Sequence, residues 1–67
     1  MNNRQYLSEN VYLTDKDLAA RYQVKRSSVW RWVRSGILPP PIKISEGCSR
    51  WVKSEIETRD AERLATR

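Results

Sequence analysis

One segment near the middle of this chain gives the clearest indication of its fold: residues 24–36 read VKRSSVWRWVRSG. The apolar side chains Val29, Trp32 and Val33 recur at helical spacing and form one stripe. The opposite face is polar, cationic and aromatic, and its members are Ser27, Trp30, Arg31 and Arg34. We therefore predict an amphipathic helix over residues 26–35, with one side turned to a core and the other to solvent or a ligand.

A shorter helix is expected just before this segment. Thr14 and Asp17 have the spacing of a capping box, which predicts a helix over about residues 15–22. Only residues 23–25 then separate the two helices, which is the length of a helix-turn-helix connection. Residues 1–10 are polar without a sustained period, and we expect them to form a flexible tail.

A hairpin is expected after the second helix, over about residues 42–51. Gly36 and the prolines at 39–41 end the helix and extend the chain. Two short apolar runs then flank a turn-like segment that contains a glycine. The side chains expected to face the core are Ile42, Ile44 and Trp51. Those expected to project outward are Lys43 and Arg50.

A last helix is predicted over about residues 54–65. Ser54 and Glu57 give it a second capping-box pattern, but its apolar content is thin. The whole sequence thus predicts a mainly α protein with a small β-hairpin. Residues 11–67 are expected to form a single winged helix-turn-helix domain.

Charge is concentrated in the middle of the chain. The 67 residues carry a net charge of +5 with a pI near 9.9. Residues 21–53 hold eight basic side chains against the single acid Glu46, a net charge of +7, while each flank is slightly acidic. Such a distribution is typical of a protein that binds a polyanion.

Composition argues against catalysis. The chain has no His and a single Cys, Cys48, so it holds no Ser-His or Cys-His pair, no zinc set and no disulfide. We therefore expect no enzyme activity, no metal and no cofactor. One unpaired Cys suits the reducing cytoplasm, and no apolar run is long enough for a membrane span. We expect a cytoplasmic protein that joins the nucleoid when it binds DNA.

Beyond topology, several motifs resemble the AlpA family of prophage regulators, and the related phage excisionases are similar. The resemblance covers roughly residues 11–60. Its central element is a basic helix of the form S-x-x-aromatic-R followed by Gly and Pro, and the remaining matches lie at Tyr12 to Thr14, Asp17-Leu18, Gly47, Arg50-Trp51 and Glu55-Ile56. One departure is Cys48, where relatives often place an Arg just after the glycine of the wing.

The resemblance implies a DNA-binding protein of a mobile element. From the charge of the segment and from the resemblance, the expected DNA-binding residues are Lys25, Arg26, Ser27, Ser28, Trp30, Arg31, Arg34, Lys43 and Arg50. The helix over 26–35 would lie in the major groove and the wing on the flanking backbone. Trp30 stays open, because a single such Trp can equally be a protein anchor or an edge of the core.

The expected function is sequence-specific binding of double-stranded DNA in transcriptional regulation, with further copies binding cooperatively on DNA. Two alternatives remain at this point. The protein could be an excisionase that bends DNA at an integration site. It could also be an adaptor that docks on integrase or RNA polymerase, with Leu64 and Trp30 as anchors.

Overall fold

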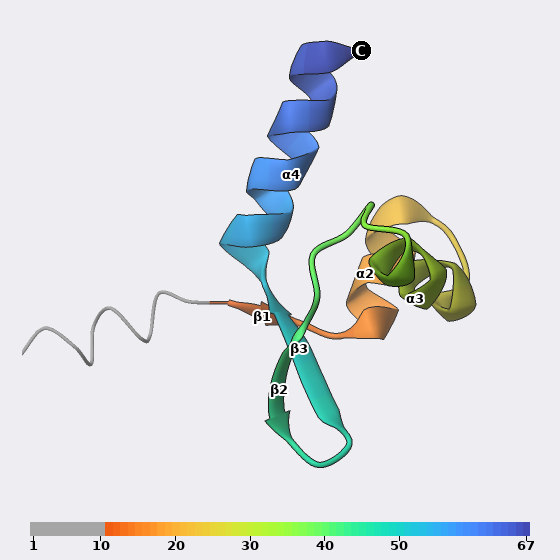
Figure 1. The fold of residues 1–67 in the computed structure, drawn as a ribbon, viewed down its shortest axis with the longest axis vertical. Coiled ribbons are helices and arrows are strands. Elements are labelled where there is room, and N and C mark those ends of the chain that lie inside the picture. Colours follow the sequence, from red (N-terminus) through yellow and green to blue (C-terminus); the bar gives the residue numbers. More distant parts are fainter. Residues whose placement is uncertain (1–10) are drawn as a thin grey trace, which may run out of the picture.

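The computed structural model describes residues 11–67, so the tail expected over residues 1–10 lies outside the described part of the chain. Over the described residues the protein has three helices and one small antiparallel sheet of three strands (Figure 1). In chain order these are β1 (Tyr12–Leu13), α2 (Asp15–Tyr22), α3 (Arg26–Arg34), β2 (Ile42–Ser45), β3 (Cys48–Val52) and α4 (Lys53–Thr66). The mainly helical class is confirmed.

The start of α2 is fixed by local hydrogen bonds. The Thr14 amide donates to the Asp17 carboxylate at 2.8 Å, and the Asp17 amide donates to the Thr14 hydroxyl at 3.0 Å. This is the capping box that the sequence predicted. At its other end the helix closes on Gln23, whose φ of 59° lies in the left-handed region. The chain reverses there within three residues and enters α3.

Helix α3 begins with no side-chain cap. Lys25 occupies the N-cap position with an extended backbone and makes no capping hydrogen bond through its side chain. The helix ends just before Gly36, whose φ of 85° is a conformation that other residues rarely adopt. Because α3 has only nine residues and no side-chain cap, packing against the rest of the protein has to hold it in place.

The sheet has the strand order β1-β3-β2, with β3 in the middle. Tyr12 pairs with Val52 and Leu13 with Trp51, and the Lys53 amide donates to the Val11 carbonyl at 2.8 Å. Strands β2 and β3 were expected from the sequence, and β1 was not. Short and apolar, β1 is stable only because β3 supplies its hydrogen-bond partners.

The expectation for Ile42 and Ile44 was wrong. Both are exposed, Ile42 by 44% and Ile44 by 55%. Ile42 pairs with Arg50, and directly paired residues share a face of the sheet, so Ile42 lies opposite to the buried Trp51. Between the Lys43 and Ser45 pairs the register shifts and leaves Ile44 without a partner on β3.

The helix predicted over about residues 54–65 is present, but the capping box predicted at Ser54 is absent. Strand β3 runs directly into the helix, which begins at Lys53 with Val52 as N-cap and no side-chain capping bond. Ser54 therefore already lies in the first turn instead of capping it. Figure 1 shows α4 and the β2–β3 hairpin extending in opposite directions from the packed centre of the protein.

The core is small and lies where the sheet meets α2 and α3. Its buried members are Leu18, Ala19, Val29, Leu38, Trp51 and Ile56. Trp51 is 1% exposed, and its indole N–H donates to the Pro39 carbonyl at 2.8 Å. The loop after α3 is thereby bound to the middle strand. None of the helices within residues 11–67, α4 included, combines the length and hydropathy of a membrane span.

Packing at the base of α4 can be tested against its exposed end. Ile56 is fully buried, whereas Leu64 on the same helix is 60% exposed. We predict that Ile56→Ala lowers the free energy of unfolding by roughly 2–4 kcal/mol, since it opens a cavity in the core. Leu64→Ala should change it by less than about 0.5 kcal/mol. Urea denaturation followed by circular dichroism measures both, and equal losses would contradict this packing.

Candidate nucleic-acid interface

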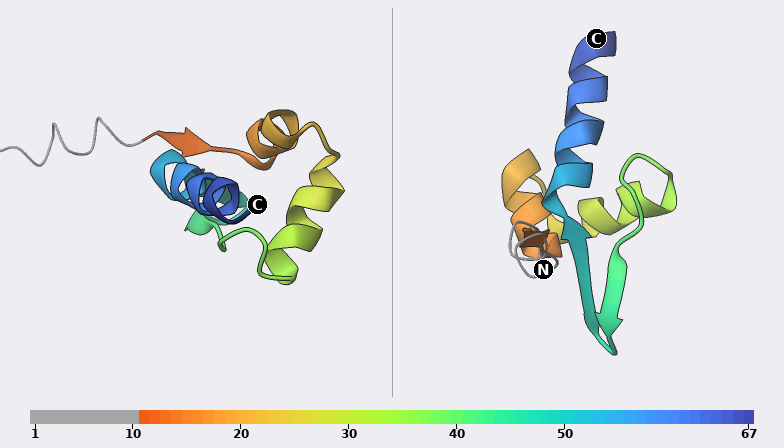
Figure 2. Two further views of the ribbon diagram at one scale, coloured as in Figure 1. Left: turned by 90° about the horizontal axis from the view of Figure 1, so that it is seen from above. Right: turned by 90° about the vertical axis from the view of Figure 1, so that its left-hand side faces the viewer.

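Helix α3 presents two different faces. Val29 is buried, and Trp32 and Val33 are half-buried against the core. The Trp32 ring meets the Tyr22 ring edge-on, with centroids 5.8 Å apart. These contacts fix which side of α3 faces away from α2. Figure 2 shows α3 beside α2, with the hairpin as a separate limb.

The outward face of α3 is cationic. The exposed residues of the expected site on this helix and its N-cap are Lys25, Arg26, Ser27, Arg31 and Arg34. Within residues 11–67, the side chains of Lys25, Arg31 and Arg34 form no ion pair. Arg31 donates to the hydroxyl of the half-buried Ser28 at 3.2 Å, a contact that leaves its charge unneutralised. This face is therefore able to bind an anion.

Asp15 holds the N-terminal half of α3. One of its carboxylate oxygens accepts hydrogen bonds from Arg26, at 3.2 Å from Nε and 3.1 Å from Nη2, and from the Trp30 indole at 3.0 Å. Partial burial raises the pKa of Asp15, but the bonds from Trp30 and Arg26 outweigh it and hold the pKa below its ordinary 3.8. The sequence analysis missed this role, because the partners lie eleven and fifteen residues away.

Trp30 lies at the edge of the core. Its ring packs on Trp51 with centroids 5.2 Å apart and a tilt of 53°. With its N–H donated to Asp15 as well, the side chain is half-buried. The sequence left three roles open for Trp30, and these contacts correspond to the one at the edge of the core. The contact joins α3 directly to the middle strand of the sheet.

The hairpin supplies the remaining residues of the expected site. Lys43 is exposed, and its Nζ lies 3.6 Å from the carboxylate of Glu46 in the turn. Arg50 is half-buried and donates to the neighbouring Ser49 carbonyl at 2.8 Å. Cys48 is a half-buried free thiol. Gly47, with φ of 74°, allows the tight turn between the strands.

Helix α4 is fastened to α2 by a second carboxylate. Asp60 accepts the Tyr22 hydroxyl at 2.7 Å and the guanidinium of Arg21 at 2.9 and 3.0 Å. Partial burial, together with the bond to this carboxylate, raises the pKa of Tyr22. This role of Asp60 has no local signal in the sequence, since its partners lie about forty residues earlier.

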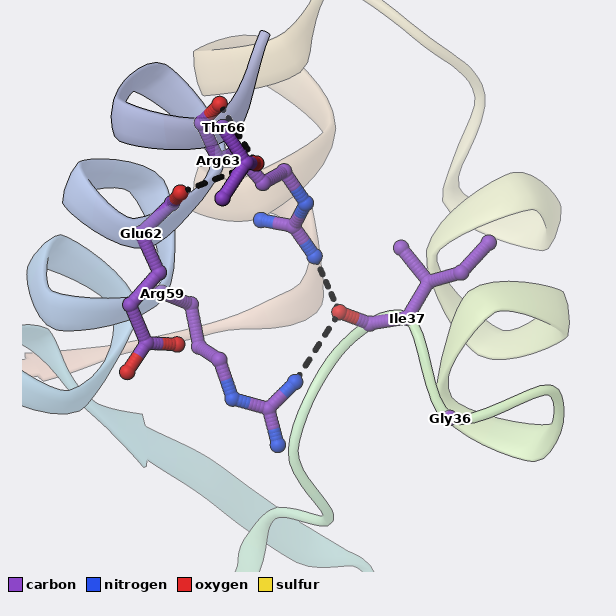
Figure 3. A pocket seen from close by; sticks show the side chains of 6 residues that line it. All are labelled: Gly36, Ile37, Arg59, Glu62, Arg63 and Thr66. Carbon is purple, nitrogen blue, oxygen red and sulfur yellow. Dashed lines mark hydrogen bonds between the residues drawn. The ribbon is translucent and has the colours of Figure 1, made fainter.

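Two arginines of α4 also reach the loop after α3. Figure 3 shows the guanidinium groups of Arg59 and Arg63 both donating to the Ile37 carbonyl, which for Arg59 is 3.2 Å away. An open hollow of about 310 Å³ lies between this loop and the helix. Because the loop leads into β2, α4 restrains the segment that links α3 to the hairpin. Among residues 11–67 no three His, Cys, Asp or Glu side chains gather as metal ligands.

The Asp15 contacts predict a pH dependence of stability. Because folding lowers this pKa, the carboxylate stabilises the fold fully above its ordinary 3.8, and the contribution is lost as the pH falls through the native value. At about pH 7, Asp15→Asn should cost about 1 kcal/mol of unfolding free energy. As the pH falls below 3.8, the difference between the variant and the parent should shrink.

Urea titrations of both proteins across this range measure the effect. Glu62→Gln is the control, because Glu62 is exposed and has no ion pair among the described residues. A cost of Asp15→Asn that does not change with pH would contradict the assignment.

Comparison with known proteins places the chain in a family. The family model described as prophage CP4-57 regulatory protein (AlpA) matches residues 14–64, from the cap of α2 to the last turns of α4. No curated protein and no solved structure was found to match. The matched region is well over half of the 67 residues and includes α2, α3 and the hairpin. The chain is thus a member of the AlpA family of prophage regulatory proteins.

Proposed function

We propose that residues 11–67 form one winged helix-turn-helix domain that binds double-stranded DNA with sequence preference. In this proposal α2 and α3 are the helix-turn-helix, α3 is the recognition helix, and the β2–β3 hairpin is the wing. The observation that carries it is the cationic face of α3, which keeps Lys25, Arg31 and Arg34 free of ion pairs among the described residues. Family membership supports DNA as the partner.

The polar and cationic residues of α3 each have a role in the proposal. Ser27 and Ser28 lie near base edges, and Arg31 and Arg34 contact guanines or phosphates in the major groove. Lys25 belongs with them, because it stands at the positive end of the helix dipole, where an anion is favoured. These contacts would fix the register of the helix in the groove.

Two members of the expected site have a different role. Trp30 and Arg26 position α3, since both donate to Asp15 and Trp30 also packs on Trp51. Arg26 is still 62% exposed at its side chain, so it can contact a phosphate while paired. Lys43 and Arg50 then contact the flanking backbone from the hairpin.

The biological output proposed is regulation of transcription. A domain of this size contacts few base pairs, so several copies binding cooperatively at repeated sites would supply the specificity. An excisionase would use the same surface at an integration site. Docking on integrase or RNA polymerase is favoured only by the exposed Leu64, since the half-buried Trp30 is already engaged by Asp15 and Trp51.

A binding titration tests the proposal. The protein is titrated by fluorescence anisotropy on DNA from upstream of its own gene and from the nearest integration junction, at two salt concentrations, with scrambled competitor. If about four to six phosphates are contacted, log affinity should fall against log salt with a slope of roughly −4 to −5. Binding that is no better than to the competitor would contradict it. Preference for one fragment would separate promoter control from excision.

Arg31 should be important for affinity. We predict that Arg31→Ala weakens binding to the preferred fragment by roughly 1–3 kcal/mol, through loss of a contact to guanine or phosphate. Lys16→Ala is the matched control: it removes an exposed cation of α2 that has no ion pair among the described residues. Anisotropy titrations measure both. Equal affinities for Arg31→Ala and the parent would remove α3 from the interface.

Glu46 should weaken binding through the wing. It is the one acid in residues 21–53 and lies beside Lys43 at the tip of the hairpin. Glu46→Gln should release Lys43 for a phosphate and increase affinity by roughly two- to fivefold, with a salt slope steeper by about one. Glu57→Gln, which opens the comparable pair with Lys53 on α4, should leave both quantities unchanged. The reverse pattern would assign DNA contact to α4.

A further inference from the structure

Ile44 is an exposed aliphatic side chain, and at this position it adds nothing to the hydrophobic core. It is 55% exposed, although the alternation of β2 assigned it to the core. The reason is the register: Lys43 pairs with Ser49 and Ser45 with Cys48, so β2 carries one residue more than β3 between those pairs. Ile44 is that extra residue. Such bulges redirect a side chain, and they recur next to functional sites.

Ile44 has basic residues nearby and lies on a narrow hairpin. Lys43 precedes it with a side chain that is 65% exposed, and Arg50 lies on the facing strand. Figure 2 shows the hairpin as a narrow two-stranded limb that extends past the helices to its tip. An apolar side chain next to the exposed cation Lys43 on a thin ribbon is suited to a partner that is anionic outside and apolar within.

Resting on the proposed function, we propose that Ile44 is an apolar wedge that enters the minor groove of DNA beside the site read by α3 and partly unstacks a base step. Aliphatic side chains inserted in this way kink the duplex toward the major groove. Pyrimidine–purine steps such as TA unstack most easily, so the wedge would add sequence preference at a position without base-edge contacts.

Glu46 limits which part of the hairpin can enter the minor groove. Its side chain is 96% exposed at the turn, and its charge would be repelled by the phosphates on either side of a narrow groove. Entry is therefore from the side of β2, where Ile44 and Lys43 lie, and not from the turn itself. Lys43 would then contact a phosphate at the edge of the groove while the Ile44 side chain passes between base pairs.

Ile42 provides a matched control. It is an isoleucine of the same strand with similar exposure, 44%, but it pairs regularly with Arg50 and stands closer to the body of the protein. Since both side chains are exposed, alanine at either position should leave the urea midpoint unchanged, and that measurement is made first.

The experiment uses the full chain and a duplex selected by the parent protein from a randomised library, labelled with a dye at each end. Energy transfer between the dyes reports bending, and anisotropy reports affinity. We expect the parent to increase transfer. Ile44→Ala should abolish that increase and weaken binding about tenfold, whereas Ile42→Ala should keep both within about twofold. Replacing the TA steps of the duplex should weaken the parent and leave Ile44→Ala unaffected.

The outcomes are distinguishable. If the parent selects DNA but Ile44→Ala bends and binds it equally well, the wedge is wrong and the proposed function stands. If the parent selects no duplex, both fail. If Ile44→Ala changes the sedimentation of the free protein instead of the DNA bend, Ile44 belongs to a contact between copies, and the wedge is again overturned.

Discussion

Burial of Trp51 is the interaction on which the rest of this small structure depends. Its ring is almost wholly inside the fold and contacts Trp30 of α3. Its backbone pairs with Leu13 of β1, and its indole N–H binds the loop that follows α3. One residue of the middle strand therefore joins α3, the sheet and the connecting loop. In a domain with so little core, such a residue sets the geometry of everything around it.

The acidic residues complement this core by holding helices in place. Asp15 fixes the start of α3 through Arg26 and Trp30, and Asp60 fastens α4 to α2 through Arg21 and Tyr22. Both carboxylates are neutralised by these partners, and Lys25, Arg31 and Arg34 have no ion pair among the described residues, so α3 keeps an outward surface of one sign. Such a surface costs stability through self-repulsion unless an anion neutralises it. We take this arrangement as the physical reason for a nucleic-acid partner.

Local signals in the sequence were sufficient for α2 and α3. A capping box, a turn of three residues and an apolar stripe at helical spacing are properties of neighbouring residues, and all were found as expected. Predicting the sheet required knowledge of contacts between strands that are distant in sequence. Strand β1 exists only because β3 lies beside it, and the bulge that exposes Ile44 depends on the register between strands. The capping box predicted at Ser54 does not form, because β3 continues directly into α4.

In the candidate site, the cationic residues of α3 were predictable from their charge and their helical spacing. The carboxylates that hold the helices in position were not predictable. Asp15 and Asp60 bind residues that are distant in sequence, so nothing in their own neighbourhood distinguishes them from surface charges. Trp30 was placed on the cationic face by its spacing, but the ring is wide enough to reach Trp51 from there.

The most direct test of the account is amide chemical-shift mapping by NMR of the labelled protein with a duplex it selects. If α3 binds DNA as proposed, the shifted amides lie in residues 25–34, which form α3 and its N-cap, and in the hairpin around Lys43, with the exposed end of α4 unchanged. Shifts confined to α4, or spread evenly over the surface, would contradict the claim that α3 reads DNA.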